Sequence, residues 1–312
     1  MKYSYSSLGK LVSFRNSQDF EIIGMLFQYG SSNKYDISNH TNKRIVIHIH
    51  GSYGNFYQNK FIWHMSKIYC ENEVDFLSIN TSAHDGLAEG YYGKNLKYVG
   101  GGVSEYQDSQ FDIQAAIDFA ISLGYIDIIL QGHSLGCDKV IDYSLHSEKK
   151  FDIILLSPAD SYALQADWIK PDTVEKQIVR IRNGLSTEGK ITWGKADFDW
   201  LENSEYGAHG NDENWIYEIP ITRKALLSIL TGSAFKYLNL ELAPEFYLDV
   251  NAMVYIGKRD GLLFCKSAEM SEYLSKKFKS FFPILDLDAD HDIVGVEEVL
   301  IKRIVLWIQN RS

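Results

Sequence analysis

The sequence predicts an α/β fold, in which a mostly parallel central sheet is flanked by helices and interrupted by one insertion. Short β-branched runs alternate with stretches of helical apolar spacing, and strands joined by helices pair in parallel. The alternation breaks down over residues 161–246, which hold four of the six tryptophans. The chain has 312 residues and 45% hydrophobic content, enough for the core of one such domain. We therefore expect residues 1–160 and 247–312 to form the core, and 161–246 to form an inserted lid.

The elements before residue 160 follow from two patterns. Each expected strand is a short, apolar, β-branched run, and each expected helix carries apolar residues three and four positions apart. In order, we expect a β-hairpin at 11–14 and 20–27, a buried strand at 44–51, a helix at 61–69, a strand at 74–79, a helix at 111–123, a strand at 126–130, a helix at 137–146 and a strand at 151–156. The glycine-rich stretch 80–102 is expected to be one long loop, and such loops are usually functional or mobile.

After the expected lid, the alternation resumes. We expect a strand at 252–257, a helix at about 267–278, a strand at 281–287 and an amphipathic helix at 299–308. Pro283 lacks the N–H that a central strand needs, so it marks an edge strand or the start of a strand. The lid is expected to lie over the carboxyl edge of the sheet, because open α/β sheets bind ligands at that edge.

Composition limits the partners of the chain. Thirty-one basic and 41 acidic side chains give a formal charge of −10 without a basic cluster, which argues against nucleic acid and anionic membranes as partners. The three cysteines lack metal-ligand spacing and favour reduced thiols. The first ten residues lack the apolar centre of a signal peptide, and no apolar run approaches the roughly 18 residues that span a bilayer. We expect a soluble, cytoplasmic protein.

The stretch Gly132-His133-Ser134-Leu135-Gly136 carries the clearest chemical signal. It matches G-x-S-x-G and stands between an expected strand and an expected helix, the context in which this pattern forms a nucleophile elbow. The glycines let the chain turn sharply, which leaves Ser134 exposed at a strand end and at a helix N-terminus. Outside that context, the pattern would indicate only a solvated serine in a glycine-rich turn. We expect Ser134 to be a nucleophile.

A serine hydroxyl is a poor nucleophile, so Ser134 needs a base and an acid that orients the base. When an elbow of this kind carries the serine, the acid and then the histidine follow it in sequence. His291, just past the last expected strand, is the only histidine after the alternation resumes. Asp260 follows the preceding strand and is the first choice for the acid, and Asp160, one strand earlier, is the alternative. Three nearer acids are expected to cap the loop or to support the catalytic residues from outside the triad: Asp288, Asp290 and Asp292.

Backbone N–H groups would stabilise the oxyanion that forms when Ser134 attacks a carbonyl. One donor in such sites is the residue after the nucleophile, which is Leu135 here. The second comes from the loop after an earlier strand, and the loop that follows His50 offers Ser52 or, alternatively, Tyr53. His50 itself is expected to be structural and to hydrogen-bond nearby backbone.

With these motifs in this order, the chain resembles an α/β-hydrolase. Residues 111–119, FDIQAAIDF, and 132–140, GHSLGCDKV, resemble a group related to fungal siderophore esterases, which cleave ester bonds in hydroxamate siderophores. The ordered motifs run from His50 to His291. The resemblance implies an α/β-hydrolase fold that needs no metal or organic cofactor. It implies that Ser134 is the nucleophile and that His291 is the base and then the acid. It also implies that Asp260 orients His291 and that the backbone N–H groups of Ser52 and Leu135 stabilise the oxyanion.

The sequence therefore predicts a serine hydrolase that cleaves a small or natural-product-like ester through an acyl-enzyme on Ser134. A thioesterase or an acyltransferase would use the same residues and would differ in what resolves the acyl-enzyme. Proteolysis and lipolysis are disfavoured, because the lid is polar and aromatic without a strongly apolar face. An alternative from another class is a non-catalytic ligand-binding protein on a hydrolase scaffold, since fold does not imply function. The sequence leaves the oligomeric state open.

Overall fold

A computed structural model describes residues 9–30, 44–168, 173–188, 222–232, 234–242 and 245–311. Within these ranges, eight strands form one sheet in the order β1-β2-β4-β3-β7-β8-β9-β10. The strands are β1 (Lys10–Arg15), β2 (Glu21–Phe27), β3 (Arg44–Ile49), β4 (Asp75–Ile79), β7 (Asp127–His133), β8 (Asp152–Leu156), β9 (Leu248–Tyr255) and β10 (Phe278–Ile284). β2 pairs antiparallel with β1 and β4, and the pairs from β4 to β10 are parallel. The expected mostly parallel sheet is confirmed.

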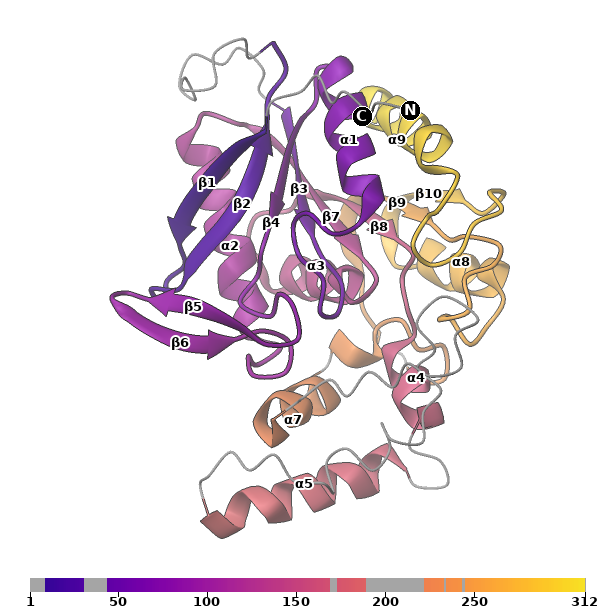
Figure 1. The fold of residues 1–312 in the computed structure, drawn as a ribbon. Helices are drawn as coiled ribbons and strands as arrows, with labels where there is room; N and C mark the ends of the chain where they lie inside the picture. The colour runs from indigo at the N-terminus through magenta and orange to yellow at the C-terminus, as the bar shows by residue number, and fades with distance from the viewer. Residues whose placement is uncertain are drawn as a thin grey trace.

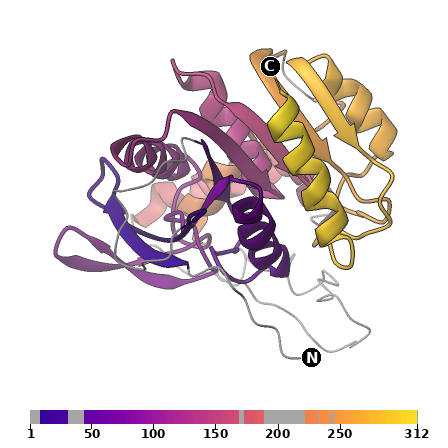
Figure 2. The ribbon, with the colours of Figure 1, turned by 90° about the horizontal axis from the view of Figure 1, so that it is seen from above.

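Helices cover both faces of this sheet (Figures 1 and 2). They are α1 (Lys60–Glu71) and α9 (Glu297–Asn310) on one face, and α2 (Asp108–Ser122), α3 (Leu135–His146) and α8 (Ser267–Ser275) on the other. In β3, Ile45 and Ile47 pack in the layer that contains α2 and α3, whereas Val46 packs in the layer that contains α1. Because both faces of β3 are buried, its sequence is mostly apolar and shows no alternation of apolar and polar residues.

The expected elements are present, and their ends differ from the pattern in several places. β9 begins at Leu248 and β10 at Phe278, both before the expected starts. α2 begins at Asp108, also earlier than expected. Pro283 lies in β10, which forms one edge of the sheet, so its missing N–H leaves no central ladder incomplete.

The expectation of one long loop over residues 80–102 is wrong in part. β5 (Ala88–Tyr92) and β6 (Asn95–Val99) form an antiparallel hairpin there, which projects beside β1 and β2 (Figure 1). The ring of Phe20 lies 5.1 Å from that of Tyr92, and the two residues form an isolated β-bridge. This contact with a distant part of the chain stabilises strands that their glycine-rich sequence does not indicate.

The described part of residues 161–246 is helical. It comprises α4 (Ser161–Trp168), α5 (Val174–Glu188), α7 (Arg223–Thr231) and the short 3-10 helix η2 (Ala234–Lys236), which lie below the sheet in Figure 1. These elements share a small apolar cluster: Val174, Ile181, Ala225, Leu226, Leu230 and Phe235. Residues 189–221 lie outside the described residues, and so do three of the tryptophans expected in the lid: Trp193, Trp200 and Trp215. No helix in the described ranges is long and apolar enough to cross a membrane.

Candidate active site

Ser134 lies in the turn between β7 and α3, at the carboxyl end of a central strand. Its φ of 55° and ψ of −128° fall in a region that residues other than glycine rarely adopt. The N–H of Ser134 donates to the carbonyl oxygen of Leu156 at 3.0 Å, which holds this turn against β8. A Cβ atom at Gly132 would lie 2.3 Å from the carbonyl oxygen of Gly136. A Cβ atom at Gly136 would lie 2.3 Å from the carbonyl oxygen of Ile49, so both glycines are needed for the strands, the turn and the helix to approach this closely.

His291 and Asp260 meet at the carboxyl ends of two neighbouring strands. Asp260 follows β9, and His291 follows β10. The Nδ1 atom of His291 lies 3.1 Å from both carboxylate oxygens of Asp260. The Asp260 side chain is fully buried, and the His291 side chain is 10% exposed. A hydrogen bond from the N–H of Arg259 to the carbonyl of Ala289, 3.0 Å long, joins the two loops and fixes this contact.

The second ring nitrogen of His291, Nε2, is buried and has no hydrogen-bond partner in the described part of the chain. A carboxylate accepts hydrogen bonds and does not donate them, so the proton of a neutral His291 resides on Nδ1. Nε2 then carries a lone pair. An imidazole in this tautomer can accept a proton from a hydroxyl group.

His133, the residue before Ser134, packs against His291. The two ring centroids are 5.2 Å apart, and Nε2 of His133 lies 3.0 Å from the carbonyl oxygen of His291. Burial, and next the charge on His291, lower the pKa of His133 to about 4. The ring is therefore neutral at pH 7, and its Nε2–H donates to that carbonyl. This contact links the turn that holds Ser134 to the loop that holds His291, across 158 positions of sequence.

The loop after β3 touches the turn that holds Ser134. A Cβ atom at Gly51 would lie 2.7 Å from the Cβ of Ser134. The next residue, Ser52, has a backbone N–H that donates to no acceptor within the described ranges, and the same is true of Leu135. Two such N–H groups beside a serine can hold a developing oxyanion. Tyr53, the alternative donor, has a φ of 52°, which is strained for a tyrosine.

Asp160, the alternative acid, makes contacts of a different kind. Its carboxylate accepts from the N–H of Ala163 at 2.8 Å, at the start of α4, and from Nδ2 of Asn239 at 2.9 and 3.1 Å. Asp160 thus ties α4 to the segment that follows η2. Nδ1 of His291 contacts Asp260, and among the described residues neither ring nitrogen of His291 makes a hydrogen bond with Asp160.

The other acids of the histidine loop have partners of their own. Asp288 accepts from Nε of Arg259 at 2.9 Å. Asp290 accepts from the N–H of Val294 at 3.3 Å, and Asp292 accepts from Nδ2 of Asn59 at 3.4 Å. Of these contacts, that of Asp290 is made to the backbone of the loop itself, and the other two join the loop to Arg259 and to Asn59.

No family model matches this sequence, and no curated protein matches it. Solved structures match along nearly the whole chain. A thermostable carboxyl esterase from Bacillus coagulans is 14% identical with a TM-score of 0.65, covering 96% of this chain and 98% of that one. Esterase Pf2001 from Pyrococcus furiosus is 13% identical with a TM-score of 0.60, covering 99% and 94%. Est1E from Butyrivibrio proteoclasticus, in a structure with ferulic acid bound, is 13% identical with a TM-score of 0.59, covering 96% and 98%.

At these identities, the likeness is one of fold. The chain has an α/β-hydrolase fold. The fold class expected from the sequence is confirmed. The finer likeness to fungal siderophore esterases is not shown by these structures, and only the two sequence motifs carry it.

Within this α/β-hydrolase fold, some polar residues near Ser134 were not assigned by the sequence. Asp138, one helical turn along α3, is fully buried, and neither carboxylate oxygen has a hydrogen-bond partner in the described part of the molecule. Burial, and next the charge of Asp160, raise the pKa of Asp138 well above its usual range. Burial lowers the pKa of the neighbouring Lys139 to about 8. Among the described residues, no group of three or more His, Cys, Asp or Glu side chains is arranged to hold a metal ion.

His50 has the structural contacts that the sequence suggests. Its Nδ1 lies 2.8 Å from the carbonyl oxygen of Gly51, and its Nε2 accepts from the N–H of Thr81 at 3.1 Å. Burial, followed by the charge of Lys139, lowers the pKa of His50 well below its ordinary value. The neutral ring therefore joins the loop after β3 to the loop after β4.

Proposed function

We propose that this protein is a serine esterase. The observation that supports this most is the contact between Asp260 and His291, because it sets the tautomer of the histidine and leaves a buried, unpaired Nε2. The carbonyl of the same histidine is held by His133, the residue next to Ser134. In this proposal Ser134 is the nucleophile, His291 is the base and then the acid, and Asp260 orients His291.

In the first step, Nε2 of His291 takes the hydroxyl proton of Ser134 as Oγ attacks the carbonyl carbon of the ester. The π electron pair of the carbonyl moves to its oxygen, and the N–H groups of Ser52 and Leu135 stabilise the resulting oxyanion. When this pair returns, the bond to the alcohol oxygen breaks. The departing oxygen takes the proton from His291, and the acyl group stays on Ser134.

In the second step, His291 takes a proton from water, and the hydroxide oxygen attacks the acyl carbon of the acyl-enzyme. The bond to Oγ breaks, and Oγ recovers the proton from His291. A thioesterase would differ in the sulfur leaving group of the first step. An acyltransferase would differ in the second step, where an alcohol or amine replaces water.

We assign residues 161–246 to a lid over this site. α4 follows directly from the carboxyl end of β8, and Asp160 at its start is bonded to Asn239 near the end of the segment. The segment thus leaves the core at the edge of the sheet that carries Ser134, and the bonds of Asn239 to Asp160 bring it back to that edge before β9 begins. Ligands of open α/β sheets bind at this edge.

We propose a small or natural-product-like ester as the substrate. The two motifs that resemble siderophore esterases favour an ester in a hydroxamate siderophore. Est1E has a structure with ferulic acid bound, which makes a ferulate ester a second choice. An aryl acetate serves as a small reference substrate for the same chemistry.

The proposal is tested by product analysis with four substrates: phenyl acetate, methyl ferulate, an ester-linked hydroxamate siderophore and a matched thioester. We expect the wild type to release acid and alcohol in equal amounts from at least one ester, and Ser134→Ala to release none above background. Equal hydrolysis by both proteins would show that Ser134 is not the nucleophile. A ligand that binds tightly and is recovered unchanged would favour the non-catalytic alternative.

A further inference from the structure

The loop between β3 and α1 is held by side chains that accept hydrogen bonds from its backbone. We call residues 51–58 the oxyanion loop. Oδ1 of Asn55 accepts from the N–H of Gln58 at 2.8 Å and from that of Tyr57 at 3.2 Å. Oδ1 of Asn80 accepts from the N–H of Phe56 at 2.9 Å.

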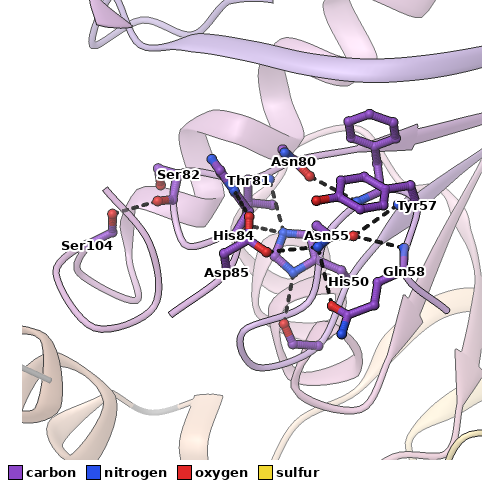
Figure 3. Close-up of polar contacts among 12 residues, drawn as sticks. His50, Asn55, Tyr57, Gln58, Asn80, Thr81, Ser82, His84, Asp85 and Ser104 are labelled. Carbon is purple, nitrogen blue, oxygen red and sulfur yellow. Dashed lines mark hydrogen bonds and ion pairs between the residues drawn. The ribbon is translucent and has the colours of Figure 1, made fainter. Parts of the chain in front are cut away.

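Asn55 is 2% exposed, and its amide nitrogen also has two partners. Nδ2 donates to Oδ1 of Asp85 at 2.8 Å and to Oε1 of Gln58 at 3.3 Å. Figure 3 shows this side chain between the oxyanion loop and the segment that carries Asp85. A carboxylate only accepts and a backbone N–H only donates, so one orientation of the Asn55 amide satisfies both sides.

Asp85 is itself fixed on three sides. Its Oδ2 lies 2.7 Å from Nδ1 of His84, its N–H donates to the carbonyl of Gly54 at 2.9 Å, and its carbonyl accepts from the N–H of Gly101 at 2.9 Å. The carboxylate therefore gives Asn55 a fixed acceptor. The oxyanion loop is joined through it to the loop after β4 (Figure 3).

These contacts engage half of the backbone N–H donors of the oxyanion loop. The N–H groups of residues 56, 57 and 58 donate to side chains, and that of Gly54 donates to the carbonyl of Gly51 at 3.4 Å. The N–H of Ser52 has no acceptor in the described part of the chain. It belongs to the residue after Gly51, which lies against the Cβ of Ser134. The network thus leaves a donor unused at the place where an oxyanion would form.

The oxyanion loop also contains backbone strain that must be held in place. Tyr53 has a φ of 52° and Asp85 a φ of 55°, values that favour glycine. Strained residues persist where the surroundings over-determine them, and they gather at functional sites. Tyr53 lies two residues before Asn55 in the loop, and Asp85 accepts a hydrogen bond from the Asn55 side chain.

We propose that Asn55, oriented by Asp85, is a positioning residue that directs the N–H of Ser52 toward the ester oxygen in the transition state. This inference rests on the esterase function proposed above. Asn55 touches neither the nucleophile nor the substrate in this role. It acts through the backbone of the oxyanion loop.

The test compares Asn55→Ala with the wild type on phenyl acetate and on O-phenyl thionoacetate. Sulfur is a larger and weaker hydrogen-bond acceptor than oxygen, so a well-placed oxyanion donor favours the oxygen ester. We expect kcat on phenyl acetate to fall about 10-fold to 100-fold, less than the loss on deleting a donor. KM should change little, and the ratio of kcat values for oxygen and thiono esters should fall. The pH profile should keep its shape, because Asp260 and His291 are untouched.

A second pair of variants separates positioning from simple folding. Asp85→Ala removes the acceptor of Asn55 and should reproduce the Asn55→Ala pattern, whereas Asp85→Asn keeps an acceptor oxygen and should recover most of the activity. Asn72→Ala is the matched control, since the side chain of this asparagine donates to the carbonyl of Ile68 at the far end of α1, away from the oxyanion loop. Thermal unfolding of each variant checks that it folds. If Asn55→Ala does not fold, the Asp85 pair makes the same comparison.

The outcomes distinguish this inference from the esterase proposal. A wild type that hydrolyses no ester overturns both. If the wild type hydrolyses phenyl acetate, three results for Asn55→Ala would overturn the positioning role and leave the esterase proposal intact. These are full activity, a change in KM alone, and an equal loss of kcat on the oxygen ester and the thiono ester.

Discussion

His133 donates a hydrogen bond of 3.0 Å from its Nε2 to the carbonyl oxygen of His291. The residue before the proposed nucleophile therefore holds the backbone of the proposed base. His133 is buried, and its ring is also 4.9 Å from that of Phe61, so it has little freedom to move. This contact couples the position of the elbow to that of the histidine loop.

Replacing His133 should impair catalysis without removing any group that reacts. We expect His133→Leu to lower kcat on phenyl acetate about tenfold or more, because the His291 loop loses its donor and a displacement of about 1 Å can cost 10²-fold. His133→Gln, which can place an amide N–H at a similar position, should keep more of the activity. Steady-state kinetics of the two variants is the measurement, and equal activity of Leu and Gln variants would contradict this role.

Asp260 and Asp160 should respond differently to the same substitution. Asp260→Asn should lower kcat by about 10³-fold to 10⁴-fold, because the amide no longer holds His291 in the tautomer that accepts a proton on Nε2. Asp160→Asn should leave kcat within about tenfold and lower the melting temperature, because Asp160 caps α4 and binds Asn239. Kinetics together with thermal unfolding separates the two. A larger loss of kcat in the Asp160 variant would make Asp160 the acid.

Gly51→Ala tests the contact between the oxyanion loop and Ser134. The added Cβ would lie 2.7 Å from the Cβ of Ser134 and 3.0 Å from the carbonyl oxygen of His133, so the backbone must shift. We expect kcat to fall at least about tenfold and stability to fall by about 1–3 kcal/mol. Gly261→Ala is the control, because nothing lies within 4 Å of its added Cβ. Urea unfolding and kinetics of both variants are the measurements, and a fully active Gly51→Ala protein would contradict the close packing.

Asp138→Asn should stabilise the protein, and more so at higher pH. The pKa of Asp138 is raised in the folded state, so the folded protein keeps a proton that the unfolded chain releases above about pH 4. Wild-type stability therefore falls as pH rises from the unfolded pKa to the folded one, by at most about 1.4 kcal/mol per pH unit. An amide at this position does not titrate.

Thermal unfolding of the wild type and Asp138→Asn between pH 5 and pH 8 measures this effect. The melting temperature of the variant should exceed that of the wild type by several degrees at pH 8, at about 2–4 °C per kcal/mol, and by less at pH 5. A difference that is the same at every pH would mean that Asp138 is ionised in the folded protein throughout.

The central strands were predictable because they are buried on both faces. β3, β7 and β8 each contain an uninterrupted apolar run of three or four residues, and each run is short enough to exclude a surface helix. The hairpin of β5 and β6 was not predictable by the same means. Its stability depends on Phe20, which is remote in sequence, and its own residues include glycines that weaken the strand signal.

The sequence indicated a short set of candidate residues for the site, but it did not show which acid contacts His291. Asp160 and Asp260 both follow a strand, so local pattern ranks them almost equally. The structure separates them because β9 lies beside β10, which brings Asp260 to His291. The order of strands in the sheet cannot be deduced from their order in the chain. The bonds of Asn55 to the oxyanion loop and of His133 to His291 depend on that same packing. No spacing of residues indicates them.

The most direct test of the esterase proposal is the intact mass of the protein after reaction with a fluorophosphonate, which labels only an activated serine. The account predicts one added phosphonyl group on the wild type, located on Ser134 by peptide mapping, and no label on Ser134→Ala or His291→Ala. A label on another serine, or a wild type left unlabelled under conditions that label a control esterase, would contradict it.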